Sequence, residues 1–266
     1  MVLTDECLKS FSFINVMAYD TNNTDHSPIW FSGTSIDYWL NRGVPEEEIV
    51  IGMPLYARPS WKQYRHLVAE NPEYAFVDYA PTVPMESYYN GMNTLREKTV
   101  IALSRAGGVM LFDVNEDTND EYSIVSMIYS LVKRTENLSK EELSRYVTVI
   151  LSQRELEFIK EDGYGVPFIN ADSRTMVPLR KPLEAIGATL SYDSKNRIVT
   201  ASKDSTTVTI PIGENVIYVN GIKVETDTEA IIKEDRTYIP LRAVLEAFGY
   251  KFDWHGSSRT VIISNN

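Results

Sequence analysis

The sequence predicts an α/β domain that forms part of a parallel (β/α) barrel, followed by an α+β domain with an internal repeat. Residues 13–20, 49–58 and 107–113 predict the barrel part, because each is an apolar run that ends in polar or aromatic residues. Helix-like segments lie between these runs, as in parallel folds whose sites sit at the carboxyl ends of the strands. The repeat appears in residues 174–180, Arg-Thr-Met-Val-Pro-Leu-Arg, which recur 62 residues later as Arg-Thr-Tyr-Ile-Pro-Leu-Arg.

The composition is that of a globular protein. A length of 266 residues with 43% hydrophobic residues suits about two packed domains. The net charge of −11 argues against a nucleic-acid partner, which would require clustered Lys and Arg. Cys7 is the only cysteine, so no disulfide within the chain is predicted. The sequence also predicts neither a membrane span nor a signal peptide.

The connections between the three strands are predicted to be mainly helical. Residues 36–42 form the first crossover helix, and residues 120–134 form the last helix of the domain. Residues 93–103 form a helix between them whose residues 96–98, Arg-Glu-Lys, are expected to face outward. The connection after the second strand is irregular and rich in aromatic rings. Among these rings Trp61 is the candidate for stacking on a sugar, whereas the others are expected to pack the loop onto the barrel.

The first strand ends in a specific motif. Residues 17–20 are Met-Ala-Tyr-Asp, and the three strands resemble the sixth, seventh and eighth strands of glycoside hydrolase family 18, the chitinase family, whose sixth strand ends in Met-x-Tyr-Asp. The resemblance covers residues 8–133 and implies the last three βα units of a TIM barrel. Residues 1–135 are therefore predicted to form a partial, chitinase-like (β/α)8 barrel.

The catalytic signature of that family is missing from the sequence. The family carries a run Asp-x-x-Asp-x-Asp-x-Glu after its fourth strand, and no such run occurs here. The chain also begins shortly before the strand that resembles the sixth, so strands one to five have no counterpart. We therefore predict no catalytic residue in this chain. Whether it is an enzyme stays open, because it is a glycoside hydrolase by resemblance only.

The resemblance implies how the remaining residues would contact a glycan. Family 18 enzymes hydrolyse β-1,4-linked N-acetylglucosamine with help from the acetamido oxygen of the substrate. Tyr19 would donate its phenol to that oxygen, and Asp20 would hydrogen-bond the distorted sugar in a supporting role. Where the eighth strand normally carries a tryptophan this sequence has Phe112, which offers less stacking area. The predicted substrate-binding residues are Met17, Tyr19, Asp20, Tyr56, Arg58, Trp61 and Phe112.

Two structural alternatives apply to these residues. Tyr19 and Asp20 would also suit a strand end that is closed by a solvated pair. Arg58 at a strand end would also suit a local ion pair.

The second domain follows a charged linker at residues 136–145. It consists of two repeats at about residues 146–203 and 206–264, each with a hairpin, a Pro-Leu-Arg strand, a short helix closed by glycine, and two further strands. The doubled segment resembles, over residues 146–264, the copper amine oxidase N-terminal-like, or stalk, domain of bacterial surface proteins.

No copper site is predicted despite that name. His26, His66 and His255 are far apart and show no metal-ligand spacing, so we expect no metal and no other cofactor. The rings of Tyr192 and Trp254, which occupy matched positions in the repeats, are expected in the core.

Two arginines also occupy matched positions in the repeats. Arg180 and Arg242 each lie one helical turn before a glutamate, Glu184 and Glu246. We expect two ion pairs within the domain rather than a binding site.

These observations favour a fragment or remnant of a family 18 protein that acts on chitin or peptidoglycan and is inactive alone. The stalk domain implies an extracellular, cell-surface or cell-wall location by family analogy. The alternatives are a non-catalytic carbohydrate-binding or cell-wall protein and a purely structural surface module. Expected partners are a glycan that contains N-acetylglucosamine and, to cover the open sheet, a missing N-terminal barrel half or a second copy. Nucleic acid and membrane are not expected partners.

Overall fold

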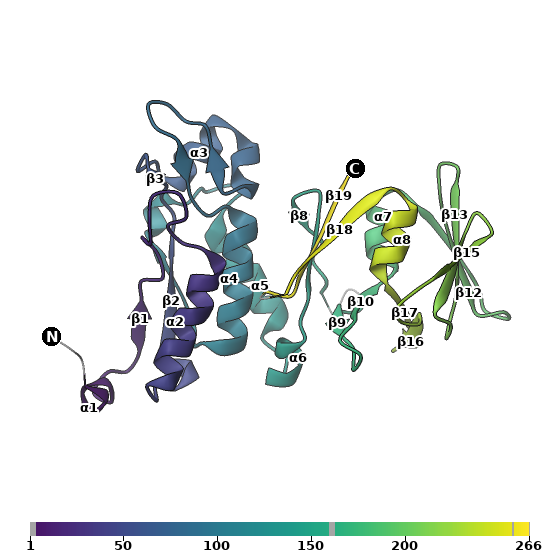
Figure 1. Cartoon of the computed structure of the whole chain (residues 1–266), viewed down its shortest axis with the longest axis horizontal. Helices are drawn as coiled ribbons and strands as arrows, with labels where there is room; N and C mark the ends of the chain where they lie inside the picture. The colour runs from purple at the N-terminus through teal and green to yellow at the C-terminus, as the bar shows by residue number, and fades with distance from the viewer. Residues whose placement is uncertain (1–3, 160–162, 257, 266) are drawn as a thin grey trace. The chain divides into compact units, whose positions relative to one another are not determined.

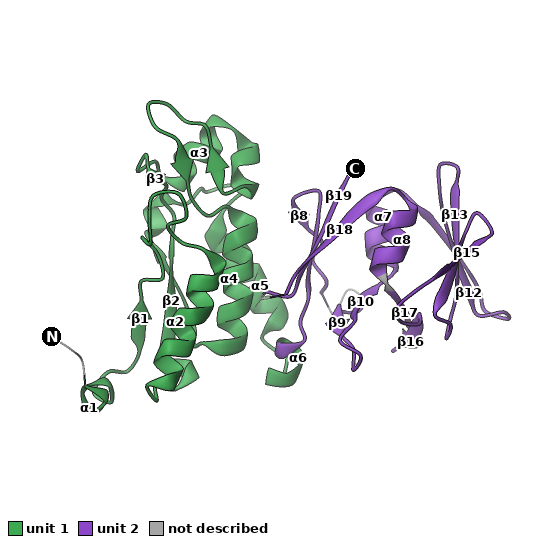
Figure 2. Cartoon of the chain, in the orientation of Figure 1, with its two compact units in different colours: residues 1–143 green, residues 144–266 purple. Residues whose placement is uncertain are grey.

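The structure is a computed structural model that describes residues 4–159, 163–256 and 258–265. The chain forms two compact units, Met1–Leu143 and Ser144–Asn266 (Figure 2). The segment predicted as a linker contains helix α6 (Lys140–Ser144). Within the described ranges, no helix combines the length and the apolar character that crossing a membrane requires.

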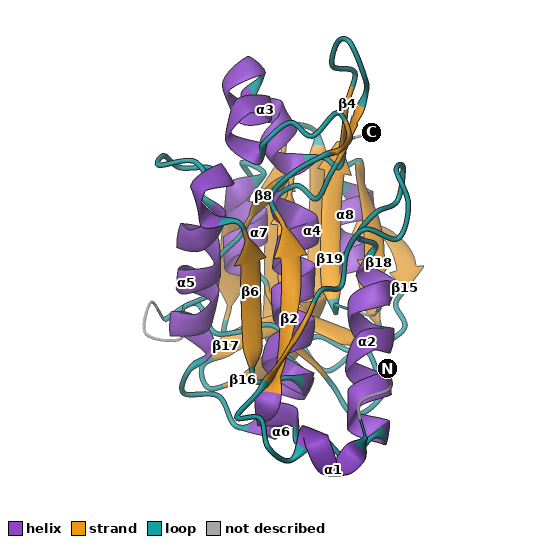
Figure 3. Ribbon diagram, turned by 90° about the vertical axis from the view of Figure 1, so that its left-hand side faces the viewer, coloured by secondary structure: helices purple, strands orange, loops and turns teal. Residues whose placement is uncertain are grey.

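The first unit is built on a parallel sheet of three strands, in the order β1 (Ile14–Val16), β2 (Ile49–Pro54) and β6 (Gly108–Phe112) (Figure 3). Val16 lies opposite Ile51, which in turn lies opposite Val109. The apolar, β-branched runs seen in the sequence therefore form neighbouring strands whose carboxyl ends meet at one edge of the sheet.

Three helices cover one face of this sheet: α2 (Ile29–Asn41), α4 (Met92–Arg105) and α5 (Ile124–Thr135) (Figure 1). Ile49, Ile51 and Met53 alternate along β2 toward the helices and are 0% exposed. The opposite face carries Gly52 and, on β6, Phe112, which is 51% exposed. The helices thus bury one face of the sheet. The opposite face carries Phe112 at the carboxyl end of β6, where it stays partly exposed.

An insertion between β2 and α4 forms a small layer of its own. It contains an antiparallel sheet with strand order β3-β5-β4 and two short helices. The side chains of Tyr64 and Tyr89 are buried inside it, and the Tyr64 hydroxyl donates to the carbonyl oxygen of Tyr122 at 3.0 Å. As expected, most of its rings pack the insertion, while Trp61 stays 59% exposed. The elements are β3 (Arg58–Pro59), α3 (Tyr64–Glu70), η2 (Pro72–Phe76), β4 (Tyr79–Ala80) and β5 (Ser87–Tyr88).

The last helix of the unit begins later than predicted. Ser123 is its N-cap and accepts from the Ser126 amide at 3.1 Å. The carboxylate of Asp117 also accepts from the amides of Ile124 and Val125, at 2.8 and 2.9 Å. These acceptors satisfy the free amides at the start of the helix and so fix it at Ile124 rather than near residue 120.

The outward orientation predicted for Arg96, Glu97 and Lys98 is wrong. Their exposed fractions are 4%, 4% and 0%. Lys98 donates hydrogen bonds to Ser27 and Asn90, which lie in the connections before α2 and before α4. The polar face of α4 is therefore covered by loops of the same unit.

Within its described residues, the second unit contains three sheets and two short helices, α7 and α8. β7 (Thr148–Leu151) and β8 (Arg154–Glu155) form the first hairpin, and β14 (Val216–Val219) and β15 (Ile222–Glu225) form the second. The second hairpin turns at Asn220 and Gly221, whose φ values of 50° and 83° suit a type I′ turn. The other elements are β9 (Phe168–Ile169), β10 (Thr175–Pro178), α7 (Arg180–Ala185), β11 (Thr189–Asp193), β12 (Ile198–Lys203), β13 (Thr206–Pro211), β16 (Ile231–Lys233), β17 (Arg236–Pro240), α8 (Leu241–Ala247), β18 (Tyr250–His255) and β19 (Thr260–Asn265).

The strands of this unit pair across the sequence. β10 and β17 run antiparallel with Val177 opposite Ile239, two residues that lie 62 positions apart. The hairpin β7–β8 joins β19, with Val149 parallel to Val261, and the hairpin β14–β15 joins β12 through β13. The first hairpin therefore completes a sheet from the other end of the unit, whereas the second extends the strands that directly precede it. A common apolar core, including Val149, Val177 and Val261, fills the space between the sheets and α7 and α8.

Candidate functional site

Six of the seven residues proposed from the sequence lie together at the carboxyl ends of the three parallel strands. Tyr19 and Asp20 follow β1, Phe112 ends β6, and the other three come from the chain that leaves β2. We call this group the rim cluster: Tyr19, Asp20, Tyr56, Arg58, Trp61 and Phe112. Ring contacts and hydrogen bonds connect all six.

A carboxylate forms the polar part of the rim cluster. Both Nε and Nη2 of Arg58 lie 3.0 Å from Oδ1 of Asp20. The Tyr56 hydroxyl donates to the same carboxylate, and Nδ1 of His26 lies 3.4 Å from Oδ1. Burial by itself would raise the pKa of Asp20, but the hydrogen bonds from Tyr56 and Arg58 and the charge of Arg58 hold this pKa below its usual range. Asp20 is therefore an anionic acceptor near neutral pH.

The aromatic part of the cluster consists of four rings in contact with one another. Tyr19 stacks on Phe112 at 6.2 Å and 26°, and Tyr56 stacks on Trp61 at 5.5 Å and 14°. The Arg58 guanidinium carbon lies 3.6 Å from the centroid of the Trp61 ring. Burial, with the nearby Asp20 charge second, raises the pKa of the Tyr19 phenol. The phenol of Tyr19 thus remains a hydrogen-bond donor at neutral pH.

Local backbone geometry brings these side chains together. Asp20 and Trp61 have φ values of 64° and 59°, in the left-handed region where a non-glycine residue is uncommon. Gly52 on the central strand leaves room for Tyr19, because a Cβ at residue 52 would lie 2.9 Å from Cε1 of Tyr19. The chain therefore turns sharply at two of the residues proposed from the sequence.

Two residues depart from the sequence-based expectation. Met17 is 69% exposed and makes no ring contact or hydrogen bond with the rim cluster. His26, which the sequence analysis considered only as a metal ligand, is 2% exposed and packs 5.3 Å from the Tyr56 ring. Burial lowers the pKa of His26, so its ring is neutral near pH 7. No spacing in the sequence connects His26 to Tyr56.

Lys98 is hydrogen-bonded to the loop that follows Asp20. Its Nζ donates to the carbonyl oxygen and to Oγ of Ser27 at 2.5 and 2.6 Å, and to Oδ1 of Asn90 at 2.6 Å. Ser27 Oγ in turn donates to the carbonyl oxygen of Ala18 at 2.9 Å, directly before Tyr19. Burial lowers the pKa of Lys98 to about 7, against the opposing charges of Asp78 and Asp25.

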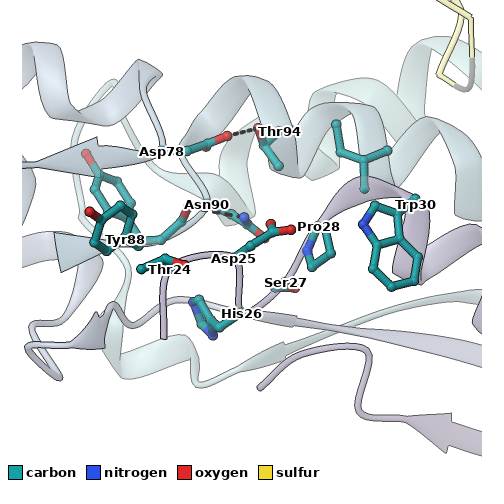
Figure 4. Close-up of a pocket in the computed structure, with 12 residues that line it drawn as sticks. Thr24, Asp25, His26, Ser27, Pro28, Trp30, Asp78, Tyr88, Asn90 and Thr94 are labelled. Atoms are coloured by element: carbon teal, nitrogen blue, oxygen red, sulfur yellow. Dashed lines mark hydrogen bonds between the residues drawn. The ribbon is translucent and has the colours of Figure 1, made fainter. Parts of the chain in front are cut away.

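A pocket of about 240 Å³ lies beside Lys98, and Ser27 and Asn90 both line it (Figure 4). On its far side Thr94 donates to the Asp78 carboxylate at 2.6 Å (Figure 4). The bond from Thr94 fastens the insertion to α4, and the bonds from Lys98 fasten the chain that follows Asp20 to the same helix.

The chemistry available at the rim cluster is that of polar recognition. It offers an ionised acceptor, phenol and guanidinium donors, and partly exposed aromatic rings. Among the described residues, no group of three or more His, Cys, Asp or Glu side chains is placed to hold a metal ion.

Comparison with known families agrees with the two resemblances seen in the sequence. Residues 3–117 match the family model described as glycosyl hydrolases family 18. The first half of the chain is similar to this family. Residues 161–263 match the copper amine oxidase N-terminal domain. Both resemblances inferred from the sequence are thereby confirmed, whereas no curated protein matches the chain.

Solved structures similar to the chain include chitinases of family 18. A chitinase, ChiB, from Flavobacterium johnsoniae is 27% identical over 47% of this chain and 43% of that chain, with a TM-score of 0.42. A chitinase-like agglutinin from Robinia pseudoacacia is 17% identical over 47% of this chain and 48% of that chain, with a TM-score of 0.38. A chitinase from Cycas revoluta, solved with (GlcNAc)3, is 20% identical over 48% of each chain, with a TM-score of 0.38. The chain thus spans less than half the length of these structures.

Proposed function

We propose that the first unit binds β-1,4-linked N-acetylglucosamine glycans at the rim cluster and does not hydrolyse them by itself. The observation that carries the proposal is that one cluster holds an accessible, ionised Asp20 carboxylate together with two exposed rings. The Asp20 side chain is 37% exposed, and Trp61 and Phe112 are 59% and 51% exposed. Rings of this kind pack against the CH faces of sugars, and the carboxylate accepts from a sugar hydroxyl or an acetamido N–H.

Each polar member of the cluster then has a role. Tyr19, whose phenol keeps its proton, donates to the acetamido oxygen of the sugar. Arg58 fixes the Asp20 carboxylate through two nitrogens on one oxygen and keeps it ionised. Tyr56 connects Asp20 to the Trp61 ring.

Binding without hydrolysis follows from the same electrostatics. A general acid for glycoside cleavage needs a pKa near the working pH. The pKa of Asp20 is held below its usual range, so Asp20 does not supply that proton. The sequence also lacks the aspartate-rich run that ends in the catalytic glutamate of the family.

The architecture belongs to the same proposal. We assign the first unit to the last three βα units of a partial TIM barrel. The second unit is a doubled stalk domain, and the match to a copper amine oxidase N-terminal domain supports it. The antiparallel pairing of Val177 with Ile239, which lie 62 residues apart, supports the internal repeat. In this proposal the second unit holds the glycan-binding unit at the outer surface of a cell.

Isothermal titration of the chain with chitotetraose tests this function. We expect saturable binding that weakens about tenfold or more in Trp61→Ala and in Asp20→Asn. Trp30→Ala is the matched control, because Trp30 is also 59% exposed but lies on α2 outside the rim cluster. We expect no release of reducing ends during incubation.

Three results would contradict the proposal. Equal losses in the Trp61 and Trp30 variants would show that the rim cluster is not the binding site. Absence of any binding to the wild-type chain would leave the purely structural role. Release of reducing ends that Asp20→Asn abolishes would show that the chain is an enzyme.

A further inference from the structure

The two matched arginines of the second unit have different surroundings. Arg180 behaves as expected, with its Nε 3.8 Å from Oε1 of Glu184 one helical turn later. Arg242 does not pair with Glu246, and its guanidinium carbon lies 5.0 Å from the centroid of the Phe252 ring. Within the described residues Arg242 has no carboxylate partner. The residue that corresponds to Phe252 in the first repeat is Leu190, which has no aromatic face.

Arg242 lines a cavity of about 280 Å³. Phe252 and Trp254 lie two residues apart on β18, so their rings share one face of the strand and form aromatic walls of the cavity. Arg174 adds a second guanidinium. Asp227 also lines the cavity, and its Oδ2 lies 3.0 Å from Nε of Arg174. The Asp227 carboxylate neutralises one of the two guanidinium groups, so the cavity carries one positive charge in a protein whose net charge is −11.

We infer that this cavity binds a pyranose that carries one carboxylate, with Arg242 receiving the carboxylate and Trp254 packing against the sugar ring. The planar guanidinium matches a carboxylate through two parallel hydrogen bonds. The aromatic walls suit the apolar face of a sugar. The volume is just below the roughly 300 Å³ at which pockets for larger ligands begin, which fits one sugar ring. A dianionic phosphate is disfavoured, because Asp227 would repel its second charge.

The inference does not depend on glycan binding by the first unit, and the test keeps the two apart. The full chain is titrated with glucuronate and with N-acetylmuramate, and with their neutral counterparts glucose and N-acetylglucosamine. Glucuronate lacks an acetamido group, so it does not report on the site proposed in the first unit. Glucuronate carries its carboxylate directly on the ring, and N-acetylmuramate carries it on a lactyl arm. Comparing the two acids shows which position of the carboxylate the cavity binds.

Arg180 provides the control from within the chain. We expect at least one of the two acids to bind, and Arg242→Gln to weaken that binding about tenfold or more. Arg180→Gln, at the same motif position in the first repeat, should leave it unchanged. Trp254→Tyr, which copies the residue at the matched position 192, should weaken binding while keeping the fold, as checked by circular dichroism. Failure of both acids to bind, or equal losses in the two arginine variants, would overturn the inference.

Discussion

Lys98 is hydrogen-bonded to Ser27 across 71 residues of sequence, and this contact holds the chain that follows Tyr19 and Asp20. Ser27 Oγ gives its own proton to the carbonyl oxygen of Ala18, so the bond between Lys98 and Ser27 Oγ uses an N–H of the lysine. Lys98 is 0% exposed, and the residues that supply its three acceptors, Ser27 and Asn90, are 1% and 6% exposed. The geometry of the rim cluster therefore depends on a residue outside it.

Replacing Lys98 with methionine should destabilise the first unit. The substitution leaves the Ser27 carbonyl and the Asn90 amide oxygen buried without a donor, which costs about 1–3 kcal/mol. Urea denaturation measures the change in the free energy of unfolding. Lys133→Met is the control, because Lys133 is half exposed and its ion pair is a surface pair with Glu136, three residues later. If both variants lose the same stability, Lys98 does not have this role.

The stability of the chain should also depend on pH through Lys98. Burial lowers the pKa of Lys98 in the folded state to about 7 from an ordinary value of 10.5, so between these values the unfolded state binds the proton more tightly. The contribution of Lys98 to the free energy of unfolding therefore rises with pH across this window, by up to about 1.4 kcal/mol per pH unit, and is lost as the pH falls toward 7. Subtracting the pH profile of Lys98→Met isolates this contribution. A flat difference between pH 7 and 10 would show that the ammonium stays fully charged.

The ionisation of Asp20 should depend on Arg58. The Cγ chemical shift of Asp20, followed by NMR during an acid titration, should give a pKa below the ordinary value of 3.8 in the wild-type chain. Arg58→Gln removes a hydrogen-bond donor and a charge, so this pKa should rise. Arg42→Gln breaks a similar pair, with Asp5 at 2.7 Å, and should leave Asp20 unaffected. An unchanged pKa in Arg58→Gln would assign the effect to other groups around Asp20.

Two glycines in the same sheet should respond differently to alanine. A Cβ at Gly52 would lie 2.8 Å from the carbonyl oxygen of Val16 and 2.9 Å from Cε1 of Tyr19, whereas nothing lies within 4 Å of one at Gly108. Gly52→Ala should therefore lower the free energy of unfolding by about 1–3 kcal/mol and weaken glycan binding. Gly108→Ala should preserve both properties. Thermal denaturation and titration with chitotetraose compare the two variants. Equal behaviour of the two variants would show that Tyr19 does not pack against Gly52 of β2.

The sequence was informative where a local pattern determines the structure. The apolar runs within residues 13–20, 49–58 and 107–113 predicted three strands, which the structure has at residues 14–16, 49–54 and 108–112, and Met-x-Tyr-Asp led to Tyr19 and Asp20. The pair of Asn220 and Gly221 predicted its hairpin turn in the same way. These signals are contained in a few adjacent residues.

The sequence was misleading where distant loops determine the environment of a residue. Lys98 stands in a polar run of a helix, and only the loops that carry Ser27 and Asn90 make it a buried residue. Tyr192 was expected in the core but is 49% exposed. Arg242 ends the same Pro-Leu-Arg motif as Arg180, yet it lies against the Phe252 ring instead of pairing with the glutamate one turn later.

The parallel pairing of β7 with β19 also affects how the second unit is made. During synthesis the hairpin β7–β8 is made well before its partner strand, because Val149 pairs with Val261, 112 residues later. A two-stranded hairpin is marginally stable by itself. The hairpin therefore keeps one edge unpaired until β19 has been synthesised, so the second unit completes its fold only after its last strand is made.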